Sequence, residues 1–319
     1  MNAKTLRVGL AQIAPQLLDR AGTLEKVLQR CTEAADAGCG LVAFGEALVP
    51  GYPIWTCRTG GARFDADDQK QMHARYLDQA VQIDQGHLQP LQELAARHSM
   101  AVILGTMERA ADRGGHSLYC SRVFILADGT IGSVHRKLMP THEERLSWAP
   151  GDGAGLRVHE VGPFSVGALN CWENWMPLAR AALYAQGENL HVALWPGSPE
   201  NTGDITRFVA RESRSYVLSV CGMLRSEDIP DAVPLRDAML AGGELLLRGG
   251  SAIAGPDGNW LQEPVCDQES LLVHDLDLQR VYEERQNFDP SGHYSRPDVL
   301  RLKVDFQRQS VLEPEDDPE

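Results

Sequence analysis

The sequence of 319 residues lacks the features that place a chain in a membrane or on nucleic acid. It contains no run of about 18 apolar residues, the length a spanning helix needs, and it does not open with the basic and apolar segments of a secretory signal. It also contains no basic run that could neutralise a row of phosphates, and 44 acidic residues against 30 Lys and Arg residues give a net charge of −14. We therefore expect neither a membrane nor a nucleic acid as a partner.

The cysteines lack the spacing of a disulfide framework or a zinc site. Seven are present, which is an odd number, and no two of them form a C-x-x-C motif. We therefore expect reduced thiols and a cytoplasmic protein. The seven are Cys31, Cys39, Cys57, Cys120, Cys171, Cys221 and Cys266.

Several catalytic motifs are absent as well. The chain has no G-x-G-x-x-G, P-loop, H-E-x-x-H or G-x-S-x-G motif, and no segment repeats at the period of a solenoid. These absences remove the usual support for a nucleotide-driven enzyme, a zinc hydrolase or a serine hydrolase. Apolar residues make up 43% of the chain, which predicts a globular protein with a substantial core.

What the sequence does contain is an alternation of predicted strands and helices. Residues 7–13 alternate as a strand, residues 23–37 carry apolar side chains at helical spacing, and residues 41–44 form a short apolar strand. A β-hairpin is predicted around Asp128 and Gly129, and the alternation continues through the second half. The pattern predicts an α/β fold.

Two segments do not fit this alternation. Residues 57–71 are polar and predict an inserted loop that runs into a helix. Residues 225–248 are charged and then leucine-rich, and we interpret them as an insertion that provides a surface for a partner.

Cys171 stands at the end of an apolar strand, residues 164–170. Asn170 favours a turn there, and Pro177 opens a segment with helical spacing. A thiol at a strand-to-helix turn is exposed above a sheet edge, where the dipole of the helix favours the nucleophilic thiolate. The alternative is that Cys171 packs as a small buried hydrophobe, as free cysteines usually do.

Glu46 and Lys137 also follow strand-like runs. Glu46 comes after residues 41–44 and a glycine, which suggests a buried carboxylate with a pKa suited to a general base; the alternative is a capping or solvated glutamate. Lys137 ends the predicted hairpin beside two other basic residues. Those residues alone favour a solvated guard of an exposed sheet edge over a cation that points into a site.

Glutamate, lysine and cysteine in this chain order, each at a strand end, are accompanied by longer motifs. These are Gly45-Glu46-Ala47, Pro50-Gly51-Tyr52-Pro53, His135-Arg136-Lys137-Leu138-Met139-Pro140-Thr141-His142, Glu144-Arg145, Asn170-Cys171-Trp172-Glu173-Asn174, Met176-Pro177-Leu178, His191-Val192-Ala193, Trp195-Pro196-Gly197 and Gly292-His293-Tyr294-Ser295-Arg296-Pro297-Asp298. With these motifs the sequence resembles the nitrilase branch of the carbon-nitrogen hydrolase superfamily, from residue 7 to about residue 300. It departs from the common pattern at Gly45, where the family often has proline.

The resemblance implies a fold and an assembly. The fold is an αββα sandwich, with two mixed β-sheets covered by helices, in a single domain over residues 1–305 made of two similar halves. An acidic tail, residues 306–319, is expected to be disordered. The family usually forms a homodimer or a larger homo-oligomer, with a spiral or filament among the possibilities, and residues 57–71 and 225–248 are the expected contact surfaces.

The resemblance also implies a mechanism. Cys171 is the expected nucleophile, Glu46 the general base, Lys137 the cation that stabilises the tetrahedral intermediate, and Glu144 a supporting carboxylate. This implication reverses the preference for Lys137 as an edge guard. An organic nitrile would be hydrolysed to the carboxylic acid and ammonia through a thioimidate and a thioester, with no metal or organic cofactor.

Four residues are expected to form the wall of the substrate pocket, and they are Tyr52, His142, Trp172 and Trp195. The alternative for each aromatic is simple core packing beside a turn. Three rival functions use the same fold. An amidase would start from the amide, a cyanide hydratase or dihydratase would act on cyanide, and an assembly protein would have lost the chemistry.

Overall fold

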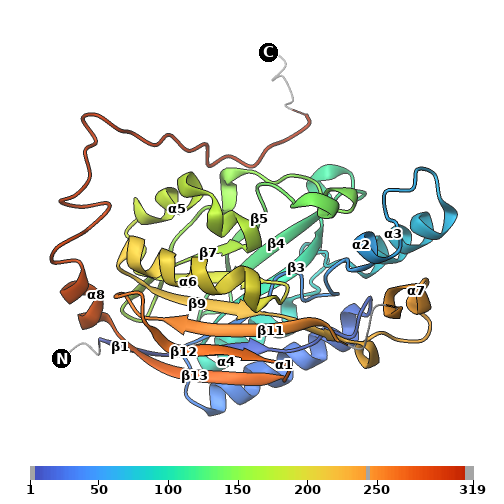
Figure 1. Cartoon of the computed structure of the whole chain (residues 1–319), viewed down its shortest axis with the longest axis horizontal. Helices are drawn as coiled ribbons and strands as arrows, with labels where there is room; N and C mark the ends of the chain where they lie inside the picture. The colour runs from blue at the N-terminus through green and yellow to red at the C-terminus, as the bar shows by residue number, and fades with distance from the viewer. Residues whose placement is uncertain (1–3, 242–244, 313–319) are drawn as a thin grey trace, which may run out of the picture.

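The computed structural model describes residues 4–241 and 245–312, and Figure 1 shows their arrangement. Two β-sheets lie face to face, and helices cover their outer surfaces. The predicted αββα sandwich is therefore confirmed. No helix in the described ranges is both long and apolar enough to span a bilayer.

The first sheet has six strands within the described residues, in the order β13-β1-β2-β3-β4-β5. The three strands β1 to β3 run parallel, and the other neighbours pair antiparallel, so the sheet is mixed. The bounds are β1 (Thr5–Gln12), β2 (Leu41–Phe44), β3 (Ala101–Arg109), β4 (Leu118–Ile125), β5 (Ile131–Arg136) and β13 (Ser270–Asp277).

The second sheet has seven strands in the same part of the chain, in the order β10-β11-β9-β8-β7-β6, with β12 paired to β11. Here β7, β8 and β9 run parallel, as β1 to β3 do in the first sheet. The bounds are β6 (His159–Val161), β7 (Phe164–Asn170), β8 (Leu190–Trp195), β9 (Tyr216–Cys221), β10 (Met223–Arg225), β11 (Leu245–Ala254) and β12 (Trp260–Cys266).

Apolar alternation along β2 shows how the layers are held. Leu41 and Ala43 point into the core between the two sheets, whereas Val42 and Phe44 point outward to helices α1 (Arg20–Asp36) and α4 (Gln89–His98). Successive side chains of a strand face opposite sides, so a strand covered on both sides is apolar throughout. On the second sheet, α5 (Pro177–Tyr184) and α6 (Pro199–Ser213) form the outer layer.

The remaining helices lie at the ends of the sandwich. They are α2 (Trp55–Arg58), α3 (Asp67–Gln79), α7 (Arg236–Leu240) and α8 (Leu278–Glu284). The predicted inserted loop runs from the end of α2 to the start of α3, as expected. The predicted insertion at residues 225–248 is wrong at its C-terminal end, because residues 245–248 begin β11 and pair with β10; residues 242–244 lie outside the described ranges.

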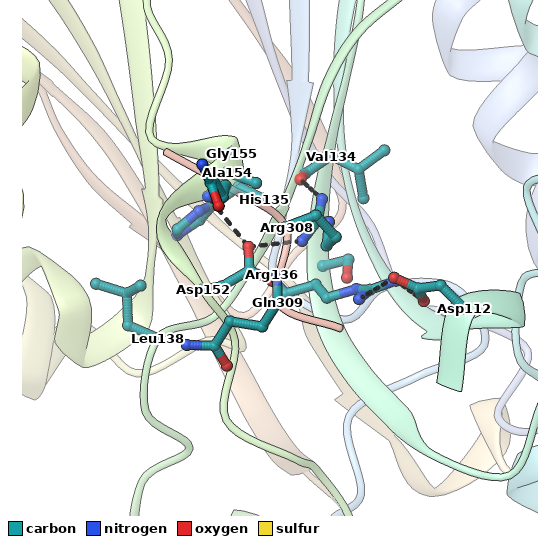
Figure 2. Close-up of polar contacts among 12 residues, drawn as sticks. Asp112, Val134, His135, Arg136, Leu138, Asp152, Ala154, Gly155, Arg308 and Gln309 are labelled. Atoms are coloured by element: carbon teal, nitrogen blue, oxygen red, sulfur yellow. Dashed lines mark hydrogen bonds and ion pairs between the residues drawn. The ribbon is translucent and has the colours of Figure 1, made fainter. Parts of the chain in front are cut away.

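Part of the predicted tail, residues 306–319, contacts the domain. Arg308 donates hydrogen bonds to Oδ1 of Asp152 at 2.9 Å and to the carbonyl of Val134 at 2.7 Å (Figure 2). The backbone N–H of Gln309 donates to Oδ2 of Asp152 at 3.1 Å. The described part of this tail, residues 306–312, which we call the C-terminal arm, is therefore held by the buried carboxylate of Asp152. Residues 313–319 lie outside the described residues, and disorder there stays a prediction.

Candidate active site

Four side chains from the predicted set converge at the strand ends. Glu46 lies two residues after β2, Lys137 directly after β5, and Cys171 directly after β7. Glu144 lies in a single 3₁₀ turn, His142–Leu146. All four side chains are buried, and one oxygen each of Glu46 and Glu144 and the sulfur of Cys171 lie within 4.8 Å of one another.

Lys137 is the centre of this cluster. Its Nζ lies 2.9 Å from Oε1 of Glu46 and 2.6 Å from Oε2 of Glu144. Only 1% of the residue is exposed, so the interpretation of Lys137 as a solvated edge guard is wrong. Although β5 is an edge strand, the residue directly after it, Lys137, is buried in the protein, where two carboxylates compensate its charge.

Glu144 is held by three donors. The hydroxyl of Tyr52 donates to Oε1 at 3.0 Å, and the ammonium of Lys137 and the backbone N–H of Thr141 each donate to Oε2 at 2.6 Å. Tyr52, predicted only as pocket wall, therefore also orients this carboxylate. With its oxygens occupied, Glu144 is placed to fix the position of Lys137.

Glu46 has one occupied and one unoccupied oxygen. Oε1 faces Lys137 and accepts a hydrogen bond from the Cys120 thiol at 3.4 Å, whereas Oε2 is buried without a partner among the described residues. Burial raises the pKa of Glu46, Lys137 lowers it and Glu144 raises it, with a result of about 7. A carboxyl group with this pKa can accept and return a proton near neutral pH.

Gly45 brings Glu46 against the second sheet. A Cβ on Gly45 would lie 2.4 Å from the backbone nitrogen of Gly222, which no side chain can tolerate. The backbone N–H of Glu46 donates to the carbonyl of Trp195 at 3.0 Å. The glycine therefore permits a close approach of two backbones.

Cys171 adopts a left-handed backbone conformation, with φ of 47°. Such a conformation costs free energy in a residue other than glycine, and it recurs at catalytic residues. It is held in part by Asn174, whose side chain donates to the carbonyl of Cys171 at 2.8 Å. Oδ1 of Asn174 in turn lies 2.7 Å from Nε2 of His191, and Nδ1 of the same ring lies 2.8 Å from Oε1 of Glu188.

The thiol is not a resting thiolate, contrary to the expectation from a helix dipole. Burial and the Glu46 carboxylate raise the pKa of Cys171 well above its ordinary value, and Lys137 and the Trp172 backbone N–H only partly oppose them. The helix α5 begins six residues later, at Pro177, so its N-terminus is not at the sulfur. The thiol therefore needs a base, and Glu46 lies beside it.

A pocket of about 170 Å³ opens above Cys171. All four residues predicted for its wall line it: Tyr52, His142, Trp172 and Trp195. The side chain of His142 is 82% exposed and lies at the mouth, whereas Trp195 is buried.

Part of the wall was not predicted. Sequence reasoning missed Thr141, Ser198, Asn201 and Thr202, which add hydroxyl and amide groups. These residues carry no periodic signal, and only the approach of α6 to the strand ends brings three of them to the pocket. The same reasoning missed Cys120, which lies inside β4.

The cluster also has the donor types of a cation site. Glu46, Glu144 and Cys171 each offer one ligand atom within the 4.8 Å spread. The Lys137 ammonium already pairs with both carboxylates and supplies the positive charge there. The arrangement suits proton transfer and nucleophilic attack on an electrophilic carbon.

Comparisons with known proteins relate the chain to one family. The carbon-nitrogen hydrolase family model matches residues 7–286. An aliphatic nitrilase of Rhodococcus rhodochrous is 36% identical over 93% of this chain and 82% of the relative, and an arylacetonitrilase of Macrophomina phaseolina (strain MS6) is 34% identical over 99% and 96%.

Solved structures share the fold. A carbon-nitrogen hydrolase of Helicobacter pylori G27 has a TM-score of 0.66 at 21% identity, over 92% of this chain and 96% of that one. A mutant of an amidase of Nesterenkonia AN1, from the nitrilase superfamily, has a TM-score of 0.64 at 18% identity, over 90% and 95%.

Proposed function

The chain belongs to the carbon-nitrogen hydrolase family, and we propose that it is a nitrilase that converts an organic nitrile to the carboxylic acid and ammonia. The observation that carries the proposal is the convergence of Glu46, Lys137 and Cys171, whose cysteine lines the pocket, in a chain about one third identical to nitrilases over nearly its whole length. The likeness to an amidase concerns the fold alone.

The first step is attack by sulfur. Glu46 removes the proton of the Cys171 thiol, the sulfur forms a bond to the nitrile carbon as one C–N π bond breaks, and Glu46 returns the proton to the nitrogen to give a thioimidate. Because the thiol is protonated at rest and Glu46 has a pKa of about 7, the proton moves between two groups whose positions are already set.

Hydrolysis then takes two water molecules. Glu46 activates the first water, which adds to the thioimidate carbon, and the protonated nitrogen leaves as ammonia to give a thioester. The second water, activated in the same way, attacks the thioester, and the carboxylic acid leaves as the C–S bond breaks and Cys171 regains its proton. The unpartnered Oε2 of Glu46 is the oxygen available for these transfers.

Lys137 and the backbone N–H of Trp172 stabilise the negative charge that develops on nitrogen and later on oxygen. An ammonium group has three N–H donors, and two are directed to Glu46 and Glu144, which leaves one for the reacting atom. A preorganised donor of this kind contributes on the order of 3 kcal/mol to the lowering of the barrier.

The test is ammonia release from a panel of aryl, arylacetyl and aliphatic nitriles, their amides and cyanide, with wild type beside Cys171→Ala. We expect at least one organic nitrile to be consumed by wild type and none by the variant. Turnover of amides alone would identify an amidase instead. Formamide, or formate with ammonia, from cyanide would identify a cyanide-hydrating enzyme.

We also propose that the protein acts as a homo-oligomer in the cytoplasm, with the face of α5 and α6 as a contact surface beside the two expected from the sequence, residues 57–71 and 225–248. Trp172 and Trp175 stack at 6.0 Å and are each partly exposed, and Leu178 and Phe208 add apolar surface on α5 and α6. Exposed apolar area of this kind is typical of protein contacts. All seven cysteines are free, as a reducing compartment requires. A monomer in light scattering at micromolar concentration would contradict the oligomer.

A further inference from the structure

Glu173 is a buried carboxylate that the proposed mechanism does not use. It lies two residues after Cys171 in the 3₁₀ turn Cys171–Trp175, and its side chain is fully buried. Its oxygens accept three donors: the backbone N–H of Leu138 at 2.6 Å, the backbone N–H of Asn170 at 2.9 Å, and Nε2 of His135 at 3.0 Å. Because both oxygens act as acceptors, Nε2 is the protonated nitrogen of the His135 ring.

The two backbone donors have a specific relation to the chemistry. Leu138 directly follows Lys137, and Asn170 directly precedes Cys171. One carboxylate therefore binds the chain next to the proposed cation and the chain next to the proposed nucleophile. Within the described residues, its hydrogen bonds go to these donors and not to the other members of the site.

The connection matters because the two strands belong to different sheets. β5 is the edge strand of the first sheet, and β7 lies in the second, so no ladder of backbone hydrogen bonds sets one against the other. The sheets meet mainly through an apolar core, which attracts without direction. The bonds from the Glu46 N–H to the Trp195 carbonyl and from Arg122 to the Ala168 carbonyl also cross between the sheets, but neither involves residues 136–138 or 170–172. A hydrogen bond has preferred distances and angles, so Glu173 supplies a directional constraint where packing supplies none.

We propose that Glu173 is a positioning residue that fixes the Lys137 ammonium relative to the Cys171 sulfur by bridging the ends of β5 and β7. The proposal rests on the roles given above to Lys137 and Cys171. Burial acts to raise the pKa of Glu173, but its interactions with His135 and the two backbone N–H groups outweigh burial and lower it. The carboxylate is therefore ionised and accepts all three bonds at neutral pH.

The main test is Glu173→Gln, which keeps the shape of the side chain. The substitution replaces one acceptor oxygen with an NH2 group, which then faces a backbone N–H and cannot accept its hydrogen bond. A shift of about 1 Å in a catalytic group can cost about 100-fold in rate, so we expect kcat to fall about 10- to 100-fold with little change in KM. We also expect Cys171 to be alkylated by iodoacetamide more slowly, with the midpoint of the pH profile moved upward, because Lys137 lowers the pKa of the thiol.

Alkylation is followed on the Cys171 peptide by mass spectrometry. Since it needs no nitrile, it tests the positioning even if the proposed substrate class is wrong. The two failures are thus separable. If Glu173→Gln has the same alkylation profile as wild type, Glu173 does not position the site. If wild type turns over no nitrile, the proposed function is wrong.

The matched control is Asp152→Asn. Asp152 is also a buried carboxylate that accepts two backbone N–H groups, those of Ala154 and Gln309, and a basic side chain, that of Arg308 (Figure 2). Its bonds fasten the C-terminal arm, so this variant should lose stability while kcat and the alkylation profile stay within about twofold of wild type.

A second variant covers the case in which Glu173→Gln does not fold. His135→Leu removes only the ring donor and leaves both backbone bonds, so it should shift kcat and the alkylation midpoint in the same direction by a smaller amount. Stability loss in both variants with wild-type kcat and a wild-type alkylation profile would show that Glu173 holds the fold and does not position the site.

Discussion

The thiol of Cys120 lies 3.4 Å from Oε1 of Glu46 and donates a hydrogen bond to it. The carbonyl of the same cysteine accepts the backbone N–H of Lys137 at 2.8 Å, so one residue of β4 contacts both the proposed base and the proposed cation. Burial raises the pKa of the Cys120 thiol well above its usual range, which keeps it a donor. Oε1 therefore already faces two donors, and we expect Oε2 to be the oxygen that accepts and returns protons during catalysis.

Removal of this donor should change the pH dependence of the enzyme. The hydrogen bond from Cys120 lowers the pKa of Glu46, so Cys120→Ala should move the acidic limb of kcat/KM to higher pH. A serine hydroxyl is shorter but a stronger donor, and Cys120→Ser should restore the limb at least in part. Equal profiles for wild type and the alanine variant would show that the thiol does not act on Glu46.

Wild-type kcat/KM should itself fall as the pH drops through about 7. The pKa of Glu46 is raised to about 7, chiefly by burial, and the base must be ionised to take the thiol proton. Protonation below that pH removes the base, so the loss of rate occurs on the acidic side. A pH-rate profile in buffers of constant ionic strength checks this; a profile flat from pH 5 to 8 would rule out Glu46 as the titrating base.

Lys137→Met should abolish turnover and destabilise the fold in a pH-dependent way. The lysine pairs with two buried carboxylates, and removal of one partner of a buried pair costs about 3–5 kcal/mol. Without the cation the folded-state pKa of Glu46 rises further above its unfolded value. A group with a raised folded pKa favours the protonated fold, so stability should fall as the pH increases.

Urea unfolding of Lys137→Met at pH 5 and pH 8 measures this effect. We expect the free energy of unfolding, relative to wild type, to drop more at pH 8 than at pH 5. The exposed pair Lys70 and Asp65 offers a control, since Lys70→Met removes a surface ion pair and should change stability by less than about 1 kcal/mol at either pH. A drop of equal size at both pH values would contradict the electrostatic account.

Gly45→Ala should damage the site through packing. The new Cβ would lie 2.4 Å from the backbone nitrogen of Gly222, so the strand end that carries Glu46 must move away from the second sheet. Overpacking of this kind costs about 1–3 kcal/mol, and we expect a lower melting temperature together with a lower kcat.

Gly203→Ala is the matched control for this substitution. Gly203 lies in α6, where a Cβ would meet no other segment of the described chain within 4 Å, and alanine favours a helix by about 1 kcal/mol over glycine. It should raise stability slightly and leave kcat unchanged. If Gly45→Ala behaves like Gly203→Ala, the close approach of the two sheets does not constrain Glu46.

The sequence by itself determined the strands named below and the positions of the reactive side chains at strand ends. Apolar runs bounded by turn residues predicted residues 41–44 and 164–170, and the structure has strands with those bounds. Such signals are local, because the alternation of side chains and the preferences of turns act over a few residues. The motifs around Glu46, Lys137 and Cys171 likewise placed each of these residues at a strand end.

Only the tertiary structure decided how those strand ends act on one another. The basic residues at the end of β5 predicted a solvated edge, yet Lys137 is buried because Glu46 and Glu144, from separate segments, compensate its charge. The helix dipole predicted a thiolate, yet burial and a neighbouring carboxylate keep Cys171 protonated. The pKa of a group depends on burial and on charges brought near by folding, and no local pattern along the chain records either.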